Sequence, residues 1–275
     1  MTQETVDQLK EHARLLRRDV LTAVHLAGDG HPGPALSIAD LVAALYFHVL
    51  RVDPARPDWP DRDRFLISKG HSCPVVYSAL ARRGFFSPDL LPTLRKLGSI
   101  LQGHPEMKHT PGIDMTTGSL GHGIPIGAGM AAAGRLQGQD YRVYVIAGDG
   151  ELNEGICWEA AMAAAHLRLD HLTVFVDHNG LQSGGTLDEV SGMNRIAEKF
   201  EAFGWHTQEI DGHDFEQILA AEARAREETE RPSVIVAKTV KGKGVPFMEG
   251  DNSWHKRVPT AGELSSALAA LGGEK

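Results

Sequence analysis

Two short polar segments of the chain carry the side chains that bind hard metal ions. Gly148-Asp149-Gly150 offers a carboxylate between two glycines, and Asp177-His178-Asn179 ends in an amide. Carboxylate and amide oxygens are ligands that Mg²⁺ and Ca²⁺ prefer. The glycines leave room for a phosphate to approach the backbone, and the N-terminus of a following helix favours its negative charge. Together the two segments predict a divalent cation that links the protein to a diphosphate.

Each segment alone also has an ordinary explanation, because Gly-Asp-Gly and Asn-Gly are both common in turns. Their setting makes the pair informative. Apolar, β-branched runs over 142–147 and 172–176 precede the two segments, and a helical stretch over 154–167 separates the runs. This order is typical of a βαβ unit with two parallel strands. Ligands of such sheets bind beyond the carboxyl ends of the strands, where Asp149 and Asn179 are expected to lie together.

The rest of the chain continues the alternation of helices and strands. Apolar residues at helical spacing from Val6 to Val24 lead into the glycine-rich loop 28–33, and Ser37 is expected to cap a second helix that reaches about His48. The polar stretch 97–123 has no periodicity and is expected to be a long functional loop. Further helices are expected over 124–136, over 214–228 and from about 261, and further strands after 61 and over 232–237.

This pattern predicts an α/β fold, an open parallel sheet with helices on both faces, in a single domain over residues 1–275. The composition is that of an ordinary globular protein, with 42% hydrophobic and 23% charged residues. The net charge of −8 argues against a nucleic-acid partner. Two cysteines, Cys73 and Cys157, indicate neither a disulfide framework nor a zinc site. No apolar stretch reaches membrane-spanning length, so a cytoplasmic protein without a membrane partner is expected.

Longer motifs extend the metal-binding segments. GDGELNEGICWEA, followed by DHNGLQ, resembles the signature of thiamine diphosphate enzymes, and its ELNEG and WEA portions resemble the transketolase version. The segments GHPGPALS, DRFLISKGH, QGHPE and TTGSLGHG have the same order and similar intervals as in transketolases, and KTVKGKG and SWHKR add a last block. From about His31 to His255 the chain is therefore similar to the N-terminal, diphosphate-binding half of a transketolase, made as a separate subunit.

The resemblance implies thiamine diphosphate and Mg²⁺ as cofactors, with Ca²⁺ able to replace Mg²⁺. It implies that Asp149 and Asn179 ligate the metal and that the carbonyl of Leu181 is the third protein ligand. The other implied positions are His71, Gly150 and His255 near the diphosphate, Gly118 and the backbone of Leu120 at the aminopyrimidine ring, His31 and His104 facing the donor sugar, Glu154 pairing across a subunit interface with the glutamate that activates the cofactor, and Lys241 in a basic block near the site. His122 departs from the family, where glutamine is common.

The resemblance also implies a reaction and a partner. Transketolases transfer a two-carbon ketol unit from a ketose phosphate to an aldose phosphate, as in the pentose phosphate pathway. Their pyrimidine-binding domain, with the activating glutamate and the arginines that bind sugar phosphate, has no counterpart in this chain. We therefore expect the partner to be a C-terminal transketolase subunit, in an α2β2 hetero-oligomer that alone is active.

Three alternatives stay open at this point. One is the α-subunit of a 2-oxo acid dehydrogenase E1, which shares the GDG-to-Asn signature but not the HPG, SKGH and GHPE blocks. The second is a transketolase for a specialised sugar. The third is a non-catalytic module of the same fold.

Overall fold

A five-stranded parallel sheet forms the centre of the computed structural model, which describes residues 2–272. The strand order is β1-β2-β3-β7-β6, and each strand pairs in parallel with its neighbours. The strands are β1 (Arg64–Ile67), β2 (Val143–Gly148), β3 (Leu172–His178), β6 (His206–Asp211) and β7 (Ser233–Lys238). The expectation of an open parallel sheet is confirmed.

Apolar residues on both faces of the central strands explain why these segments read as unbroken hydrophobic runs. Along β2, Tyr144 and Ile146 pack into one hydrophobic core, whereas Val143 and Val145 pack into a second core. Successive side chains of a strand point to opposite faces, so the two cores lie on the two sides of the sheet. The sheet is therefore an inner layer that needs helices on each side.

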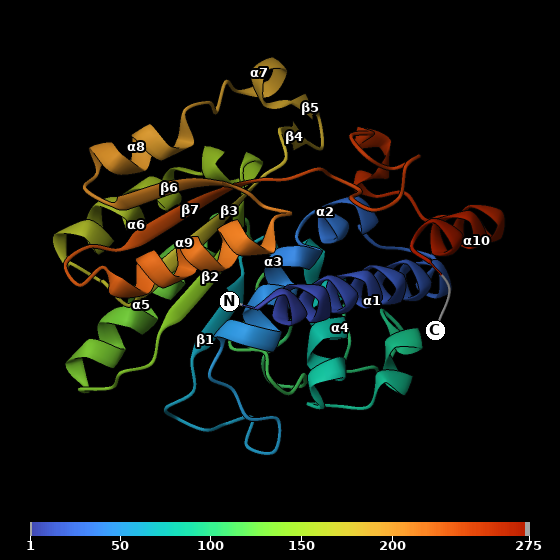
Figure 1. Ribbon diagram of the computed structural model, residues 1–275, viewed down its shortest axis with the longest axis horizontal. Coiled ribbons are helices and arrows are strands. Elements are labelled where there is room, and N and C mark those ends of the chain that lie inside the picture. Colours follow the sequence, from blue (N-terminus) through green and yellow to red (C-terminus); the bar gives the residue numbers. More distant parts are fainter. Residues whose placement is uncertain (1, 273–275) are drawn as a thin grey trace.

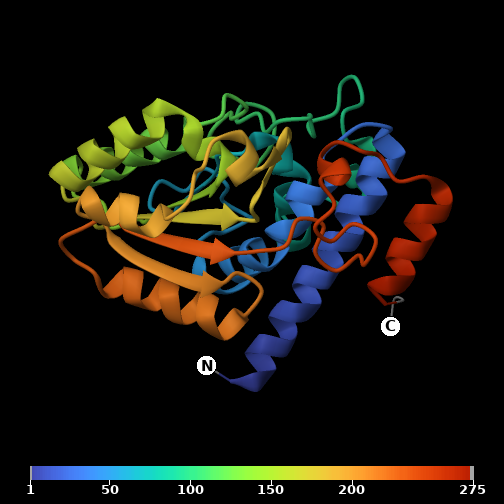
Figure 2. The same ribbon diagram turned by 90° about the horizontal axis from the view of Figure 1, so that it is seen from above.

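Helices cover both faces, as Figures 1 and 2 show. One layer contains α5 (Gly123–Leu136), α6 (Gly155–His166) and α8 (Ile196–Ala202), which share a core with Val145. The other contains α1 (Gln3–Ala27), α3 (Ala39–Ala44), α4 (Cys73–Arg83) and α9 (Phe215–Glu227), which share a core with Tyr144. In Figure 2 the sheet lies between α5 and α6, in yellow-green, and α9, in orange.

The remaining elements are mostly short. They are α2 (Pro32–Ser37), the π-helical turn η1 (Leu45–Val49), the 3-10 turns η2 (Gly70–Ser72), η3 (Pro88–Thr93), η4 (Gly150–Asn153) and η5 (Asn252–His255), the helices α7 (Leu187–Val190) and α10 (Ala261–Ala270), and the hairpin of β4 (Leu181–Gln182) and β5 (Gly185–Thr186). Across residues 2–272, no helix is both long enough and apolar enough to cross a membrane.

The expectation that Ser37 caps the second helix is wrong, although helical structure does reach past His48, through α3 and η1. Pro32 begins a helix earlier, at the position where proline is most favourable, and Ser37 is the last residue of that helix. Ile38 has a non-helical backbone, with φ −102° and ψ 8°, and separates α2 from α3. The Ser37 hydroxyl instead donates to the carbonyl of Pro34, at 3.0 Å, and to the carboxylate of Asp177, at 2.8 Å. Ser37 therefore supports the end of β3.

Candidate functional site

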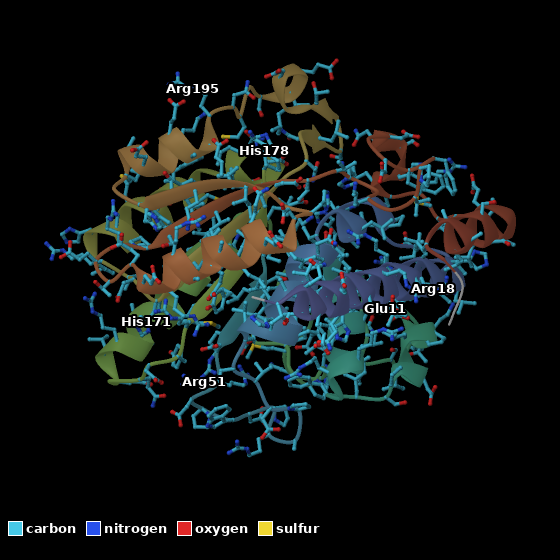
Figure 3. All side chains as sticks on the ribbon, viewed as in Figure 1. Glu11, Arg18, Arg51, His171, His178 and Arg195 are labelled. Atoms are coloured by element: carbon cyan, nitrogen blue, oxygen red, sulfur yellow. The ribbon has the colours of Figure 1, made fainter. Side chains whose placement is uncertain are left out.

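A pocket of about 440 Å³ opens where β2 and β3 end. Figure 3 labels the two histidines that flank β3, His171 before its start and His178 at its carboxyl end. Of the predicted site residues only Glu154 does not line this pocket; those that do are His31, His71, His104, Gly118, Leu120, Asp149, Gly150, Asn179, Leu181, Lys241 and His255. Positions far apart in the chain thus share one cavity, at the end of the sheet where ligands of parallel α/β folds bind.

Asp149, directly after β2, is a buried carboxylate that makes no ion pair within residues 2–272. Its Oδ1 accepts a hydrogen bond from the N–H of Gly150 and its Oδ2 accepts one from the N–H of Gly180, both at 2.7 Å. Burial, followed by repulsion from Asp177, raises the pKa of Asp149 to about 7. A carboxylate held in place without a positive partner suits a bound cation, which would offset the cost of burying its charge.

Asn179 and Leu181 supply oxygen atoms beside Asp149. The Asn179 Nδ2 donates to Asp177 at 2.8 Å, and its Oδ1 accepts from the N–H of Leu181 at 3.1 Å. The Leu181 carbonyl accepts from Lys241 Nζ at 3.2 Å. In the described part of the chain no three His, Cys, Asp or Glu side chains gather as a metal site. A cation here would therefore depend on one carboxylate, one amide and one carbonyl, a donor set that fits Mg²⁺.

Asp177, near the end of β3, supports the side chain of Asn179. Its buried carboxylate accepts hydrogen bonds from Lys69 Nζ, from the Thr239 hydroxyl and, as described, from Ser37 and Asn179. Burial raises the pKa of Asp177, but the charge of the Lys69 ammonium and the hydrogen bonds from Lys69, Thr239 and Ser37 together outweigh burial, so the pKa lies below its usual value. An ionised Asp177 can only accept, so it identifies the end of the Asn179 amide that it contacts as the N–H₂ group and the other end as the oxygen.

Four histidines line the pocket. The rings of His31, His71 and His255 lie 5.0 to 5.5 Å apart, measured between centroids. Burial is the main cause that lowers their pKa values, to about 4 for His31 and His255 and about 2 for His71. Burial, and then Arg95, also lowers the pKa of His104. Near pH 7 these imidazoles are neutral, so each can donate from one ring nitrogen and accept at the other, as binding to sugar hydroxyls requires.

Lys241 is a buried cation in the same pocket. Its Nζ donates to Asn252 Oδ1 at 2.8 Å and contacts His255 Nδ1 at 3.3 Å. Burial, and then the charge of Lys69, lowers its pKa to about 8. Gly33 allows this arrangement, because a Cβ there would lie 2.8 Å from the carbonyl oxygen of Trp254 and 3.1 Å from Cγ of Lys241. The ammonium can compensate part of the charge of a diphosphate.

Glu151, which the sequence motifs did not single out, joins the turn after β2 to the loop that carries Gly118 and Leu120. Its buried carboxylate accepts from the N–H of Gly148 at 3.0 Å, from the N–H of Gly121 at 2.7 Å and from the Ser68 hydroxyl. Burial raises its pKa. One side chain of the pocket lining therefore connects the turn after β2 to the Gly118–Leu120 loop.

Glu154 lies on the surface at the N-terminus of α6. A Cβ built on Gly121 would lie 2.7 Å from the Cβ of Glu154, so the glutamate is next to the loop that contains Leu120. The structure thus separates Glu154 from the pocket lining and exposes its carboxylate. Its pairing with a second subunit stays a prediction.

Other residues line the pocket that the sequence did not indicate: Pro34, Lys69, Arg95, Glu151, Gln182, Ser183 and Lys256. Several lie inside the motifs, such as Lys69 in SKGH and Lys256 in SWHKR, but nothing in those motifs alone points to a role for them. Arg95 follows a proline-containing 3-10 turn and belongs to no motif.

Comparison with known proteins identifies relatives along the whole chain. Residues 7–274 match the family model described as transketolase, thiamine diphosphate binding domain. A 6-deoxy-6-sulfo-D-fructose transketolase subunit of Clostridium sp. (strain MSTE9) is 43% identical over 98% of both chains. An apulose-4-phosphate transketolase subunit of Phocaeicola vulgatus is 40% identical over 96% of this chain and 93% of its own.

Solved structures agree with these relatives. A transketolase of Pichia stipitis superposes on 96% of this chain with a TM-score of 0.92 and 32% identity, and that of Leishmania mexicana on 96% with a TM-score of 0.91 and 34% identity. This chain spans 40% and 41%, respectively, of those longer chains. The prediction of a transketolase-type, diphosphate-binding chain is confirmed. The chain belongs to the transketolase family and corresponds to its thiamine diphosphate-binding domain.

Proposed function

We propose that this chain is the α-subunit of a two-chain transketolase, which transfers a two-carbon ketol unit from a ketose to an aldose. One observation carries the proposal: oxygen donors for a metal and four neutral histidines face a single pocket at the carboxyl ends of β2 and β3. The family match favours this reaction over that of a 2-oxo acid dehydrogenase. A complete set of polar groups in the pocket argues against a non-catalytic module.

In this proposal Asp149, Asn179 and the Leu181 carbonyl hold Mg²⁺, which Ca²⁺ can replace. Lys241, His71, His255 and the backbone of Gly150 bind the diphosphate, and Gly118 and Leu120 contact the aminopyrimidine ring. When bound, thiamine diphosphate supplies a carbon centre that stores the electron pair of the broken C–C bond. The protein's part is to bind the cofactor in one orientation beside the sugar.

His31 and His104 act on the sugar. As neutral imidazoles they hydrogen-bond its hydroxyls and move a proton to or from a hydroxyl oxygen as the bond between the two sugar fragments breaks or forms. Their low pKa values keep a lone pair available on each ring near pH 7. Glu154, exposed beside the Leu120 loop, pairs with a glutamate of the partner chain.

A second chain is part of the proposal. Relatives that this chain matches over more than nine-tenths of their length are named as subunits, which supports a separate partner. That partner would carry the pyrimidine-binding domain, and two copies of each chain would form an α2β2 assembly. The names of the relatives also support a specialised sugar, because they refer to 6-deoxy-6-sulfo-D-fructose and apulose-4-phosphate. We therefore propose a donor ketose with an anionic terminal group, either a phosphate or a sulfonate.

A ketol-transfer assay tests the function. The chain, alone and mixed with its candidate partner, is supplied with thiamine diphosphate, Mg²⁺, glyceraldehyde 3-phosphate as acceptor, and either fructose 6-phosphate or 6-deoxy-6-sulfofructose as donor. We expect transfer only in the mixture, with a plateau at equimolar chains. Asp149→Ala should abolish transfer and raise the cofactor Kd, measured by calorimetry, by about 10- to 100-fold. The control is Asp58→Ala, whose side chain is exposed and lies outside the pocket; it should match the wild type. Cofactor binding without transfer in any mixture would refute the transketolase assignment.

A further inference from the structure

Two loops carry the proposed sugar-binding histidines, and one ion pair links them. His31 follows Asp29 by two residues, and His104 directly follows Gly103. Arg95 Nη2 contacts Asp29 Oδ2 at 2.8 Å, and both Arg95 and the two histidines line the pocket. Lys256 Nζ approaches the other oxygen of Asp29 at 3.9 Å. The carboxylate of Asp29 therefore lies between two cations at the side of the pocket where His31 is found.

The guanidinium of Arg95 also packs on the second loop. A Cβ built on Gly103 would lie 2.5 Å from the Arg95 Cζ, so the planar group rests against the bare Cα of this glycine. The Arg95 N–H donates to the carbonyl of Leu101 at 2.8 Å, which joins Arg95 to the start of the second loop. Arg95 has a φ of 61°, in the left-handed region that residues other than glycine rarely adopt. Such a backbone persists where surrounding contacts enforce it.

Within residues 2–272, packing and not hydrogen bonding orients the two imidazole rings. His31 Nδ1 is buried and has no hydrogen-bond partner within residues 2–272. Its ring is positioned by packing against His71 and His255 and by the backbone of its own loop. Within the same residues, the ring of His104 makes no side-chain hydrogen bond either. The spacing between the two rings therefore follows the spacing between the two loops.

We propose that Arg95 is a positioning residue for the donor sugar: its ion pair with Asp29 and its packing on Gly103 fix the His31 loop relative to the His104 loop. The inference rests on the proposed ketol transfer for the identity of the ligand. The coupling of the two loops by one side chain follows from the contacts of Arg95 with Asp29 and Gly103. Arg95 itself touches neither reacting atoms nor cofactor in this role.

A second effect of Arg95 is electrostatic. The charged and titratable groups facing His31 are Lys256, Arg95, Asp29, His104, His71 and His255. Burial is the main cause of the lowered pKa of both rings, and Arg95 lowers it further in both. Removal of this cation raises both pKa values. Because the neutral rings bind the sugar, the acid limb of the activity profile then moves to higher pH.

The first test compares variants in the two-chain enzyme. For Arg95→Gln and for Asp29→Asn we expect the donor KM to rise about tenfold, as for the loss of one partly exposed charged pair. We expect kcat to fall as well, because the same histidines move the proton, whereas the cofactor Kd should be nearly unchanged. The double variant should be no worse than the worse single variant. Arg95→Lys retains the charge and should keep the acid limb of kcat/KM in place, whereas Arg95→Gln should shift it upward.

Arg82→Gln is the matched control. Arg82 pairs with Asp19 between α4 and α1, its side chain is 28% exposed compared with 26% for Arg95, and it does not line the pocket. This variant should keep the wild-type KM and pH profile. A KM for Arg95→Gln equal to that of Arg82→Gln, with an unmoved acid limb, would overturn the proposal.

A second test does not depend on activity. The histidine side-chain ¹⁵N resonances of the full chain are assigned with His31→Asn and His104→Asn and then titrated. Asp29→Asn should disturb the His104 resonances as well as those of His31, and Arg95→Gln should raise both pKa values. If Asp29→Asn disturbs only His31, the two loops are not coupled and the inference fails. If the coupling is present but no mixture transfers a ketol unit, the proposed function fails while the coupling of the loops stands.

Discussion

At the scale of single residues, the pocket contains a buried carboxylate, Asp149, that makes no ion pair within residues 2–272. Asp149 is fixed by two backbone N–H groups and lies near Asp177, yet Lys69, whose charge acts on Asp149, already forms an ion pair with Asp177. The consequence is a carboxylate whose pKa rises to about 7, mainly through burial. A divalent cation would supply the missing positive charge.

Glu151 is the residue on which we expect the Gly118–Leu120 loop to depend. Replacement by alanine removes the acceptor for two buried N–H groups, those of Gly121 and Gly148. Each unsatisfied buried donor costs about 1–3 kcal/mol, so Glu151→Ala should lower the free energy of unfolding by about 2–4 kcal/mol. Urea unfolding followed by circular dichroism measures this change.

Glu151→Gln provides the comparison, because it keeps one side-chain oxygen and the volume of the side chain. We expect it to lose less than half of what the alanine variant loses. Equal losses for the two variants would mean that packing, rather than hydrogen bonding to the loop, accounts for the effect.

At the scale of elements, the glycines of α5 have an explanation within this chain. Abundant glycine and alanine in this helix suit close packing either against a partner or inside the domain. Gly127 faces inward, where a Cβ would lie 2.7 Å from Val145 Cγ2 of β2. Gly129 faces open space, because a Cβ there would have nothing within 4 Å. Close packing on β2 therefore accounts for Gly127, and Gly129 lies on the outer side of the helix.

These two glycines form a matched pair for a test. Gly127→Ala should destabilise the chain by about 1–3 kcal/mol, because the helix must move away from β2. Gly129→Ala should be neutral or stabilising by up to about 1 kcal/mol, because alanine is the better helix former. Thermal unfolding of the chain alone compares them. A loss of stability for Gly129→Ala as large as that for Gly127→Ala would show that the packing of α5 is not as described.

The strands and helices that could be predicted from the sequence are those with a strong local pattern. The buried strands β2, β3 and β7 are continuous apolar runs, and α1 and α9 show helical spacing. In contrast, β6 (His206–Asp211) has only Ile210 as a buried residue and lies at the sheet edge, so its polar sequence carries no strand signal. The start of α2 escapes prediction because the HPG motif resembles a loop, although Pro32 is well suited to begin a helix.

The site residues also fall into those that a sequence pattern indicates and those that it does not. Residues within the motifs, such as Asp149 and His71, were found because order and spacing identified them together. Arg95 and Glu151 could not be assigned, because their roles depend on contacts with Gly103 and Gly121, which lie in other segments. Such contacts produce no periodic pattern in the sequence, because they form only when the irregular 97–123 stretch folds against the end of the sheet.

At the scale of the whole molecule, a buried charge cluster joins the N-terminal helices to the far edge of the sheet. Arg17 of α1 donates to both carboxylate oxygens of Asp40 in α3, at 3.0 and 2.5 Å. His213, in the turn between β6 and α9, contacts the same carboxylate at 2.6 Å, and its Nε2 accepts from the N–H of Val240 after β7. Segments from both ends of the chain therefore meet at one carboxylate.

This cluster predicts how the stability of the molecule depends on pH. Burial raises the pKa of Asp40, but the charge of Arg17 and the hydrogen bonds outweigh burial, so the folded-state pKa lies below its usual value. The unfolded chain, with a pKa of about 3.9, then binds the proton more tightly than the folded chain. The contribution of Asp40 is complete above that pH and is lost as the pH falls through the folded-state pKa.

Asp40→Asn removes this ionisation and leaves Arg17 buried without a negative partner. At pH 7 we expect the variant to be less stable than the wild type by about 3 kcal/mol, as for a broken buried ion pair. The difference should begin to narrow below about pH 4, where Asp40 of the unfolded wild-type chain takes up a proton, and should keep narrowing until the folded Asp40 is protonated as well. Urea unfolding between pH 7 and 3 measures it, with the exposed Asp58→Asn expected to parallel the wild type throughout. A difference that stays constant over this range would mean that the ionised carboxylate does not hold the N-terminal helices to the sheet.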